Sequence, residues 1–165
     1  MKPLFSILLL SSLLFSCAGS DDETTLYQDT YVESINAAVN YTIIESEILD
    51  LVNNYRVSKN LSKLQTLSII SNVANGHTDY MIKDGKVSHA NFNDRAEKLI
   101  TNANAKTVSE NVAFGYSSAQ AVVNGWISSD SHRKIIENPD FTHFGISTEA
   151  DKEGKNYFTQ IFINK

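Results

Sequence analysis

Three side chains that could do chemistry lie far apart in the chain: His89 in the run VSH, Glu110 in SENVAFGY and His132 in SSDSHRKII. Two neutral imidazoles and one carboxylate form a plausible site for a divalent ion, because zinc accepts a His₂Glu set with one open position. Without a metal, the same groups would form a hydrogen-bonded cluster in which a carboxylate orients an imidazole that acts as a base. Catalysis would also need a nucleophile and oxyanion donors, which the sequence does not identify.

Glu110 is the unusual residue of the stretch SENVAFGY. Alternate side chains of a strand share a face, so this run predicts Glu110 on the same side as Val112, Phe114 and Tyr116. A buried carboxylate without partners costs several kcal/mol, roughly the whole stability margin of a domain. We therefore expect Glu110 to have partners and to lie between two imidazoles, those of His89 and His132.

Two helices are predicted in the first half of the chain. Residues 44–55 have apolar side chains at helical spacing, and Thr42 and Glu45 have the spacing of a capping box. Arg56, at the end of this helix, is expected to interact with the helix dipole or with a carbonyl group and not with a substrate. A second apolar stripe over residues 67–81 predicts a helix that ends at the following Asp-Gly pair.

His77 lies on the apolar stripe of this second helix. A histidine in such a place is more often a satisfied or cavity-lining residue of the core than a metal ligand. A short helix is predicted over residues 93–100, after the loop that contains His89. Arg95 in that helix is placed to clamp this loop.

The second half of the chain predicts a covered sheet. Ser117 or Ser118 caps a helix over residues 119–127, and a hairpin follows with arms at residues 143–150 and 156–163. The second arm has apolar side chains on both faces, so helices should cover both sides of the sheet. The predicted class is α+β, a three-layer α-β-α sandwich with a small, mainly antiparallel sheet.

The N-terminus resembles a bacterial lipoprotein signal, since Lys2 and an apolar stretch of about a dozen residues precede Cys17. We expect residues 1–16 to be the signal peptide, residues 17–41 the lipidated N-terminus and tether, and residues 42–165 the folded domain. Acylated Cys17 would then anchor the chain to the membrane of the bacterial cell envelope, facing the periplasm or the cell surface. The alternative is an ordinary signal peptide followed by a coincidental cysteine.

Composition excludes several other classes of protein. The formal net charge is −5, which argues against nucleic acid as a partner, and the single cysteine allows no intramolecular disulfide. None of the patterns GxGxxG, P-loop, HExxH, GxSxG or CxxC occurs, so the common cofactor and nucleophile signatures are absent.

A set of short motifs resembles a known family in its order along the chain. They are LVNNYR, SH, SENVA, GWISS, SHR and FGI, spread over roughly residues 45–163. This order is similar to the CAP superfamily of cysteine-rich secretory, antigen 5 and pathogenesis-related proteins, and in particular to its bacterial SCP-domain branch. The resemblance implies an α-β-α sandwich whose central cavity gathers two histidines and two acids.

When the site residues of the family are matched one by one to this sequence, the resemblance places His89, Glu110 and His132 in that cavity. The second acid should stand three residues after the tryptophan, where this chain has Ser129, followed by Asp130. These two residues are therefore ligand-cleft candidates. Ser131, next to His132, is a poor candidate for a catalytic triad, because adjacency in sequence does not give hydrogen-bonding geometry.

The predicted function is that of a cell-envelope lipoprotein that binds a divalent metal such as zinc, a small lipid or glycan, or both, in a His/Glu cleft. One alternative is a hydrolase of peptides or glycans that uses Glu110 and His132, although a role other than that of an enzyme is favoured. A second is a non-catalytic protein-interaction module. In a purely structural role, Glu110 would only brace loops through His89 or a backbone amide.

Overall fold

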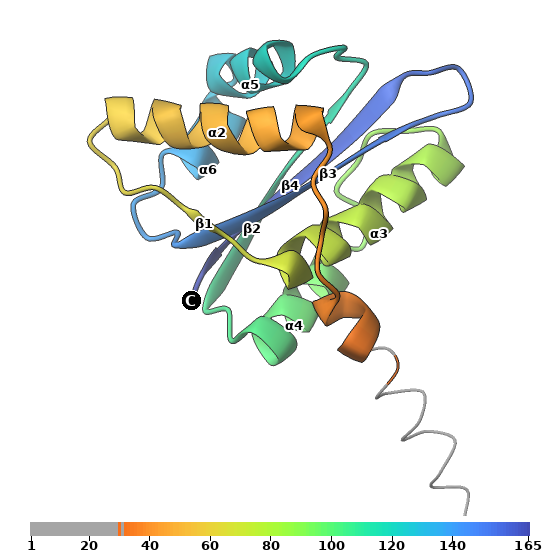
Figure 1. The fold of residues 1–165 in the computed structure, drawn as a ribbon, viewed down its shortest axis with the longest axis horizontal. Helices are drawn as coiled ribbons and strands as arrows, with labels where there is room; N and C mark the ends of the chain where they lie inside the picture. Colours follow the sequence, from red (N-terminus) through yellow and green to blue (C-terminus); the bar gives the residue numbers. More distant parts are fainter. Residues whose placement is uncertain (1–29, 31) are drawn as a thin grey trace, which may run out of the picture.

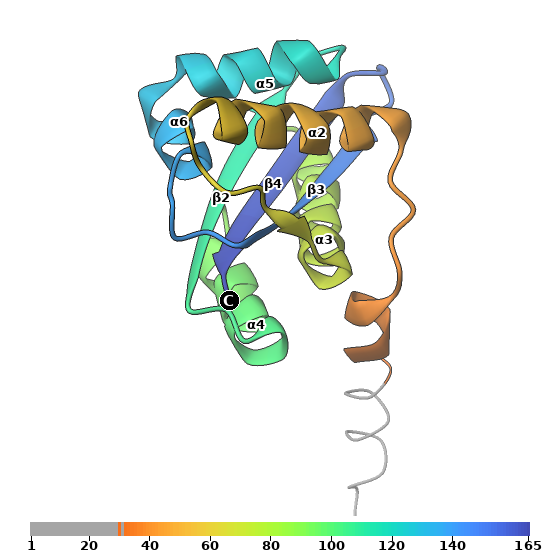
Figure 2. The same ribbon diagram turned by 60° about the vertical axis from the view of Figure 1, so that its left-hand side comes forward.

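The computed structural model describes residue 30 and residues 32–165, so the predicted signal peptide and Cys17 lie outside the described residues. A four-stranded sheet lies between two layers of helices (Figures 1 and 2). The helices after residue 42 are α2 (Ile43–Ser58), α3 (Ser68–Asp84), α4 (Phe92–Ala103), α5 (Ala119–Ser128) and α6 (Asp130–Ile136). The strands are β1 (Gln65–Thr66), β2 (Thr107–Phe114), β3 (His143–Ala150) and β4 (Asn156–Asn164).

The sheet has the strand order β1-β3-β4-β2. The hairpin strands β3 and β4 pair antiparallel, β2 pairs antiparallel with the other side of β4, and only the two-residue β1 is parallel to its neighbour β3. Glu110 of β2 lies opposite Ile161 of β4, and Val112 lies opposite Thr159. The prediction of a small, mainly antiparallel sheet within three layers is thus confirmed.

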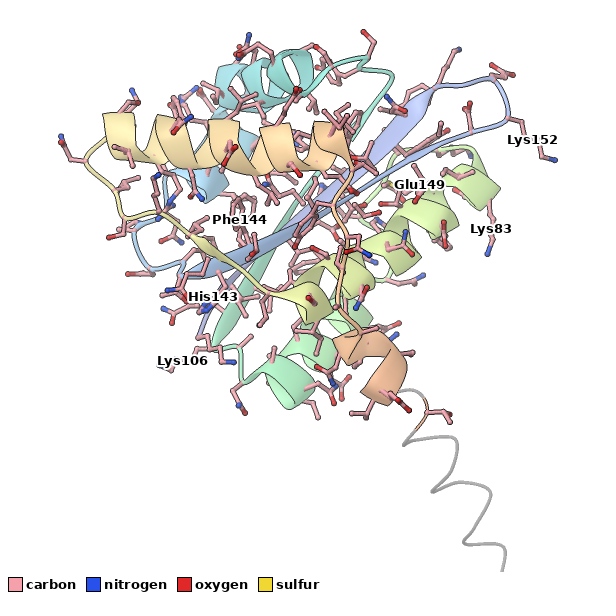
Figure 3. The ribbon with its side chains drawn as sticks, in the orientation of Figure 1. Lys83, Lys106, His143, Phe144, Glu149 and Lys152 are labelled. Atoms are coloured by element: carbon pink, nitrogen blue, oxygen red, sulfur yellow. The ribbon has the colours of Figure 1, made fainter. Side chains whose placement is uncertain are left out.

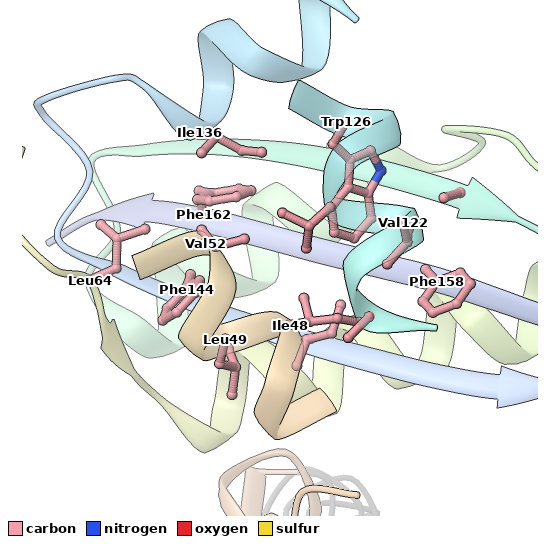
Figure 4. Close-up of a cluster of buried hydrophobic side chains, with 14 of the residues drawn as sticks. Ile48, Leu49, Val52, Leu64, Val122, Trp126, Ile136, Phe144, Phe158 and Phe162 are labelled. Atoms are coloured by element: carbon pink, nitrogen blue, oxygen red, sulfur yellow. The ribbon is translucent and has the colours of Figure 1, made fainter. Parts of the chain in front are cut away.

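Alternation along β4 explains why helices cover both faces of the sheet. Phe158 and Phe162 pack against α2, α5 and α6 in one buried cluster, which contains Trp126 (Figure 4). Ile161 and Ile163, on the opposite face, pack against α3 and α4 in a second cluster. A strand buried on both sides lacks polar alternation, as the hairpin sequence predicted.

Helix α2 begins and ends as its sequence predicted. The Thr42 hydroxyl accepts a hydrogen bond from the Glu45 N–H, and the Glu45 carboxylate accepts one from the Thr42 N–H, which completes the capping box. Arg56 is buried and donates to three carbonyls: those of Ser62 at 2.9 Å, Ile136 at 2.6 Å and Asn138 at 2.9 Å. It therefore binds carbonyls, as expected, and joins the end of α2 to the end of α6.

Two parts of the strand and helix prediction need correction. Strand β2 ends at Phe114 because Gly115 has a φ of +81°, so Tyr116 lies beyond the strand and does not share the face of Glu110. Helix α6 and strand β1 were not predicted. They have seven and two residues, too few for a periodic pattern to be recognised.

The end of the predicted tether contacts the folded domain. Ile35 is buried in the cluster of α3 and α4, and the Asn72 side chain donates to its carbonyl at 3.0 Å. The Tyr41 hydroxyl lies 2.9 Å from the Ser71 hydroxyl. The packed part of the chain thus begins before residue 42. Within the described residues, no helix has the length and apolar character needed to cross a membrane.

We predict that the same substitution at two glycines has opposite effects on stability. A Cβ at Gly145 of β3 would lie 2.6 Å from the backbone nitrogen of Ser71 in α3, whereas a Cβ at Gly76 of α3 would meet nothing within 4 Å. Gly145→Ala should lower the free energy of unfolding by about 1–3 kcal/mol or more through overpacking. Gly76→Ala should raise it by about 0.5–1 kcal/mol through helix propensity.

Urea unfolding of the two variants measures both effects. Equal destabilisation by the two substitutions would contradict the direct contact between α3 and β3.

Candidate functional site

Glu110 is the centre of a buried ionic cluster between β2, α3 and α4. Its side chain is 1% exposed, and both carboxylate oxygens accept hydrogen bonds from Arg95, Nε to Oε2 at 2.8 Å and Nη2 to Oε1 at 2.8 Å. His89 Nδ1 lies 2.8 Å from the same Oε1. This two-pronged pairing is the strongest geometry available to an arginine and a carboxylate.

Arg95 also fixes the loop that contains His89. Its Nη1 donates to the Ala90 carbonyl at 2.6 Å, one residue after His89. The prediction that Arg95 clamps this loop is confirmed. Its pairing with Glu110 was not predicted, because the two residues lie 15 positions apart on different elements.

His77 of α3 is the second imidazole beside Glu110. It is buried, and its Nε2 donates to the Ser88 carbonyl at 2.7 Å and lies 3.8 Å from Glu110 Oε1. Burial lowers the pKa of His77, and this effect outweighs the nearby carboxylate. His77 is thus a satisfied core residue, as predicted, and it occupies the place beside Glu110 where we expected His132.

Glu110 remains a carboxylate in spite of its burial. Burial by itself raises the pKa of a carboxyl group, but the hydrogen bonds from His89 and Arg95 and the positive charge of Arg95 act in the opposite direction. The net result is a pKa of Glu110 below its ordinary value. The charge of Glu110 is therefore compensated within the protein.

A cleft of about 540 Å³ lies in front of this cluster, between the end of β2, the loop around His89 and helices α5 and α6. Of the predicted site residues, His89, Ser129 and His132 line it, whereas Glu110 and Asp130 do not. Its other lining residues are Val87, Ser88, Val112, Ala113, Phe114, Tyr116, Gly125 and Trp126. The cleft thus has a polar side and a larger apolar side.

Tyr116, Gly125 and Trp126 are cleft residues that the sequence did not identify as such. A Cβ at position 125 would collide with the Tyr116 hydroxyl, so the glycine allows this side chain to lie across α5. The Trp126 Nε1–H donates to the Val112 carbonyl at 3.1 Å and holds α5 against β2. The glycine before Trp126 could have indicated that another group packs closely against α5. The sequence does not show that this group is Tyr116, because its position depends on the direction of the chain after Gly115.

His132 and Ser129 form a pair of their own in the cleft. His132 Nδ1 lies 2.8 Å from the Ser129 hydroxyl oxygen. The pKa of His132 is lowered by burial and then by His89, so this imidazole is mainly neutral near pH 7. Asp130 faces away: its side chain is 82% exposed and pairs with Arg133 at 2.5 Å, so it does not replace the missing acid.

The three predicted metal ligands do not form a single preformed set. Among the described residues, no group of three or more His, Cys, Asp or Glu side chains is arranged to hold an ion. Arg95 and His89 already occupy three of the roughly four lone-pair sites of the Glu110 carboxylate, which leaves at most one site, on Oε2, for a metal. Zinc binding by His89, Glu110 and His132 thus stays a prediction, and the geometry assigns Glu110 a bracing role as well.

The remaining histidine, His143, lies at the opposite end of β3 from Glu149 (Figure 3). It is hydrogen-bonded to the Thr142 hydroxyl at 2.8 Å and does not line the cleft. It plays no part in the site.

We predict strong energetic coupling between Arg95 and Glu110. Arg95→Met or Glu110→Gln alone should lower the free energy of unfolding by about 3–5 kcal/mol, because each leaves a buried polar group without its partner. The double variant should lose less than the sum of the two by about 1–3 kcal/mol. Urea unfolding of the four proteins measures this coupling.

The ion pair of Asp130 and Arg133 provides the matched control, because the Asp130 carboxylate is 82% exposed. Asp130→Asn should change the free energy of unfolding by only about 0–1 kcal/mol. Additive effects of Arg95→Met and Glu110→Gln, each no larger than that of the control, would refute the bracing role.

Comparison with known sequences identifies relatives of this chain. The profile of the Cysteine-rich secretory protein family, CAP, matches residues 49–162. YlbC, a membrane protein of Bacillus subtilis, is 34% identical over 129 residues, which cover 75% of this chain and 35% of YlbC. YkwD of the same organism is 28% identical over 155 residues, which cover 90% of this chain and 59% of YkwD. The chain spans less than two thirds of the length of either relative.

Solved structures show the same fold. An outer surface protein from Borrelia burgdorferi has a TM-score of 0.69 at 19% identity, covering 79% of this chain and 98% of that one. An extracellular protein containing a SCP domain from Bacillus anthracis has a TM-score of 0.65 at 26% identity, covering 83% and 50%. Since the family profile also matches most of the folded domain, this chain belongs to the CAP, or cysteine-rich secretory protein, family.

Proposed function

We propose that this chain is a cell-envelope lipoprotein whose CAP domain binds a small, uncharged and partly apolar ligand, a lipid or a glycan fragment, in the cleft beside His132. The observation that carries the proposal is the lining of the cleft. Its volume of about 540 Å³ is typical of small-molecule sites, as is an apolar wall with a few converging polar groups.

The electrostatics of the cleft favour an uncharged ligand. No Asp, Glu, Lys or Arg is among the described residues that line it, and Glu110 behind it is already paired with Arg95. A charged ligand would lose its hydration without gaining a counter-charge, which costs several kcal/mol. Neutral His132 and the Ser129 hydroxyl instead offer hydrogen bonds to hydroxyl, ether or carbonyl groups.

The aromatic rim favours a ligand with apolar surface. Phe114 and Tyr116 are both partly exposed at the cleft, and the Phe114 ring packs on Tyr157 with centroids 4.5 Å apart. Such rings present a firm surface for an acyl chain or for the C–H face of a sugar. Both kinds of compound occur in a bacterial envelope.

An envelope location is supported by the N-terminal sequence and by the relatives. The similar proteins include a membrane protein, an outer surface protein and an extracellular protein. Acylation of Cys17 would place the domain in water next to a membrane, where lipids and glycans are available. A divalent ion bound by His89 and His132 is the alternative chemistry for the same cleft.

We predict that the cleft binds a ligand saturably and that the fluorescence of Trp126 changes on binding. Trp126 is the only tryptophan and lines the cleft, so its fluorescence should change when the cleft fills. The mature chain with Cys17→Ser is titrated separately with a monoalkylglycerol ether, an N-acetylglucosamine oligosaccharide and Zn²⁺. We expect saturation with the ether or the oligosaccharide.

Two valines of similar exposure provide the matched control. Val87 at the cleft is 46% exposed, and Val57, on α2 and away from the cleft, is 49% exposed. Val87→Ala should weaken binding about fivefold through lost apolar contact, and Val57→Ala should not change it. If neither organic probe gives saturation, the proposal fails. A response to Zn²⁺ alone, lost in His89→Ala and in His132→Ala, would favour the metal alternative.

A further inference from the structure

Helix capping does not account for the position of the Ser129 hydroxyl. Ser129 is the N-cap residue of α6, but its side chain makes no capping hydrogen bond. Serine is favoured at this position because its hydroxyl normally accepts a hydrogen bond from the first turn of the helix. Here the oxygen lies 2.8 Å from His132 Nδ1 and 3.2 Å from the Ser131 hydroxyl oxygen, and both Ser129 and His132 line the cleft.

The backbone on both sides of this pair is held in place. The Ser129 N–H donates to the Trp126 carbonyl at 3.2 Å, at the end of α5. The His132 carbonyl accepts a hydrogen bond of 3.3 Å from the side chain of Asn111, which is fully buried in the sheet. The two side chains therefore meet on a fixed frame, which a reactive pair requires.

We propose that Ser129 is a nucleophile and His132 its general base, and that the pair hydrolyses carboxylic esters bound in the cleft. This inference rests on the proposed function, because the ester must enter the same cleft. A hydroxyl whose proton is directed at an imidazole nitrogen is the arrangement that activates serine in hydrolases of unrelated folds.

The proposed reaction needs only water as co-reactant. Ser129 Oγ attacks the ester carbonyl carbon, its proton passes to His132 Nδ1, and the alcohol leaves with that proton, so that an acyl-serine remains. Water then attacks the acyl carbon, gives a proton to His132 Nδ1, and releases the carboxylic acid as the proton returns to Ser129 Oγ. His132 accepts at Nδ1 in the tautomer that has its proton on Nε2.

The lining of the cleft argues for esters over glycosides. Hydrolysis of a glycosidic bond usually needs two carboxylates on opposite sides of the bond. Among the described residues that line the cleft there is no carboxylate, and Glu110 is held by Arg95. The apolar side chains of Val87, Phe114 and Trp126 suit an acyl chain. The substrate class is therefore an uncharged ester with an apolar acyl group.

A covalent probe tests the pair directly. The mature chain with Cys17→Ser is treated with diisopropyl fluorophosphate, an uncharged reagent that modifies activated serines, and the adduct is located by mass spectrometry. We expect one adduct, on Ser129. Ser129→Ala should abolish it, and His132→Gln should slow its formation about 100-fold. Ser128→Ala, at the exposed end of α5, is the matched serine control and should label like the parent protein.

Three results would overturn the inference: no adduct on the folded parent protein, an adduct on Ser131 instead of Ser129, or labelling of Ser129 at an unchanged rate in His132→Gln. Circular dichroism and thermal melting show whether each variant is folded. Binding of the non-hydrolysable monoalkylglycerol ether separates the two proposals. If the ether binds and Ser129 is not labelled, the esterase inference is wrong and the binding function stands.

Discussion

The buried pair of Glu110 and Arg95 is the interaction on which the arrangement of the site depends. Glu110 lies on the edge strand β2, and Arg95 on α4 reaches it with two nitrogens while a third holds the Ala90 carbonyl. His77 on α3 and His89 in the loop complete the cluster. One carboxylate thereby connects two helices, a strand and a loop. The loop that contains His89 forms part of the cleft wall, so this wall depends on the cluster.

The pairing of the Glu110 carboxylate with Arg95 also determines which groups of the cleft can contact a ligand. Because Arg95 takes both oxygens of Glu110, the carboxylate does not present a free charge to a ligand. At the position where the resemblance implies a second acid, this chain has Ser129, whose hydroxyl oxygen lies 2.8 Å from His132 Nδ1. Among the described residues, the lining of the cleft thus contains no Asp, Glu, Lys or Arg, and it has hydroxyl and imidazole groups on one side and aromatic rings on the other.

Local signals were enough to predict most of the fold. The capping box before α2, the glycine after α3 and the two-faced hairpin strand each depend on residues close together in sequence, and all three are confirmed. The order of motifs placed His89 and His132 in one cleft. The partners of Glu110 could not be predicted in the same way, because which face of α3 and α4 meets β2 is decided by packing across the sheet. Arg95 and His77 became partners only through that packing.

The most direct test of the bracing role of Glu110 is an NMR pH titration of its side-chain carboxyl carbon. We expect a midpoint below the ordinary glutamate pKa of 4.5. The unfolded chain then binds more protons than the folded one below that pH. The contribution of Glu110 to stability should therefore be complete above pH 4.5 and lost as the pH falls through the folded-state pKa. A midpoint above 4.5 would show that the effect of burial outweighs that of Arg95, and Glu110 would then not be the charged residue that braces the site.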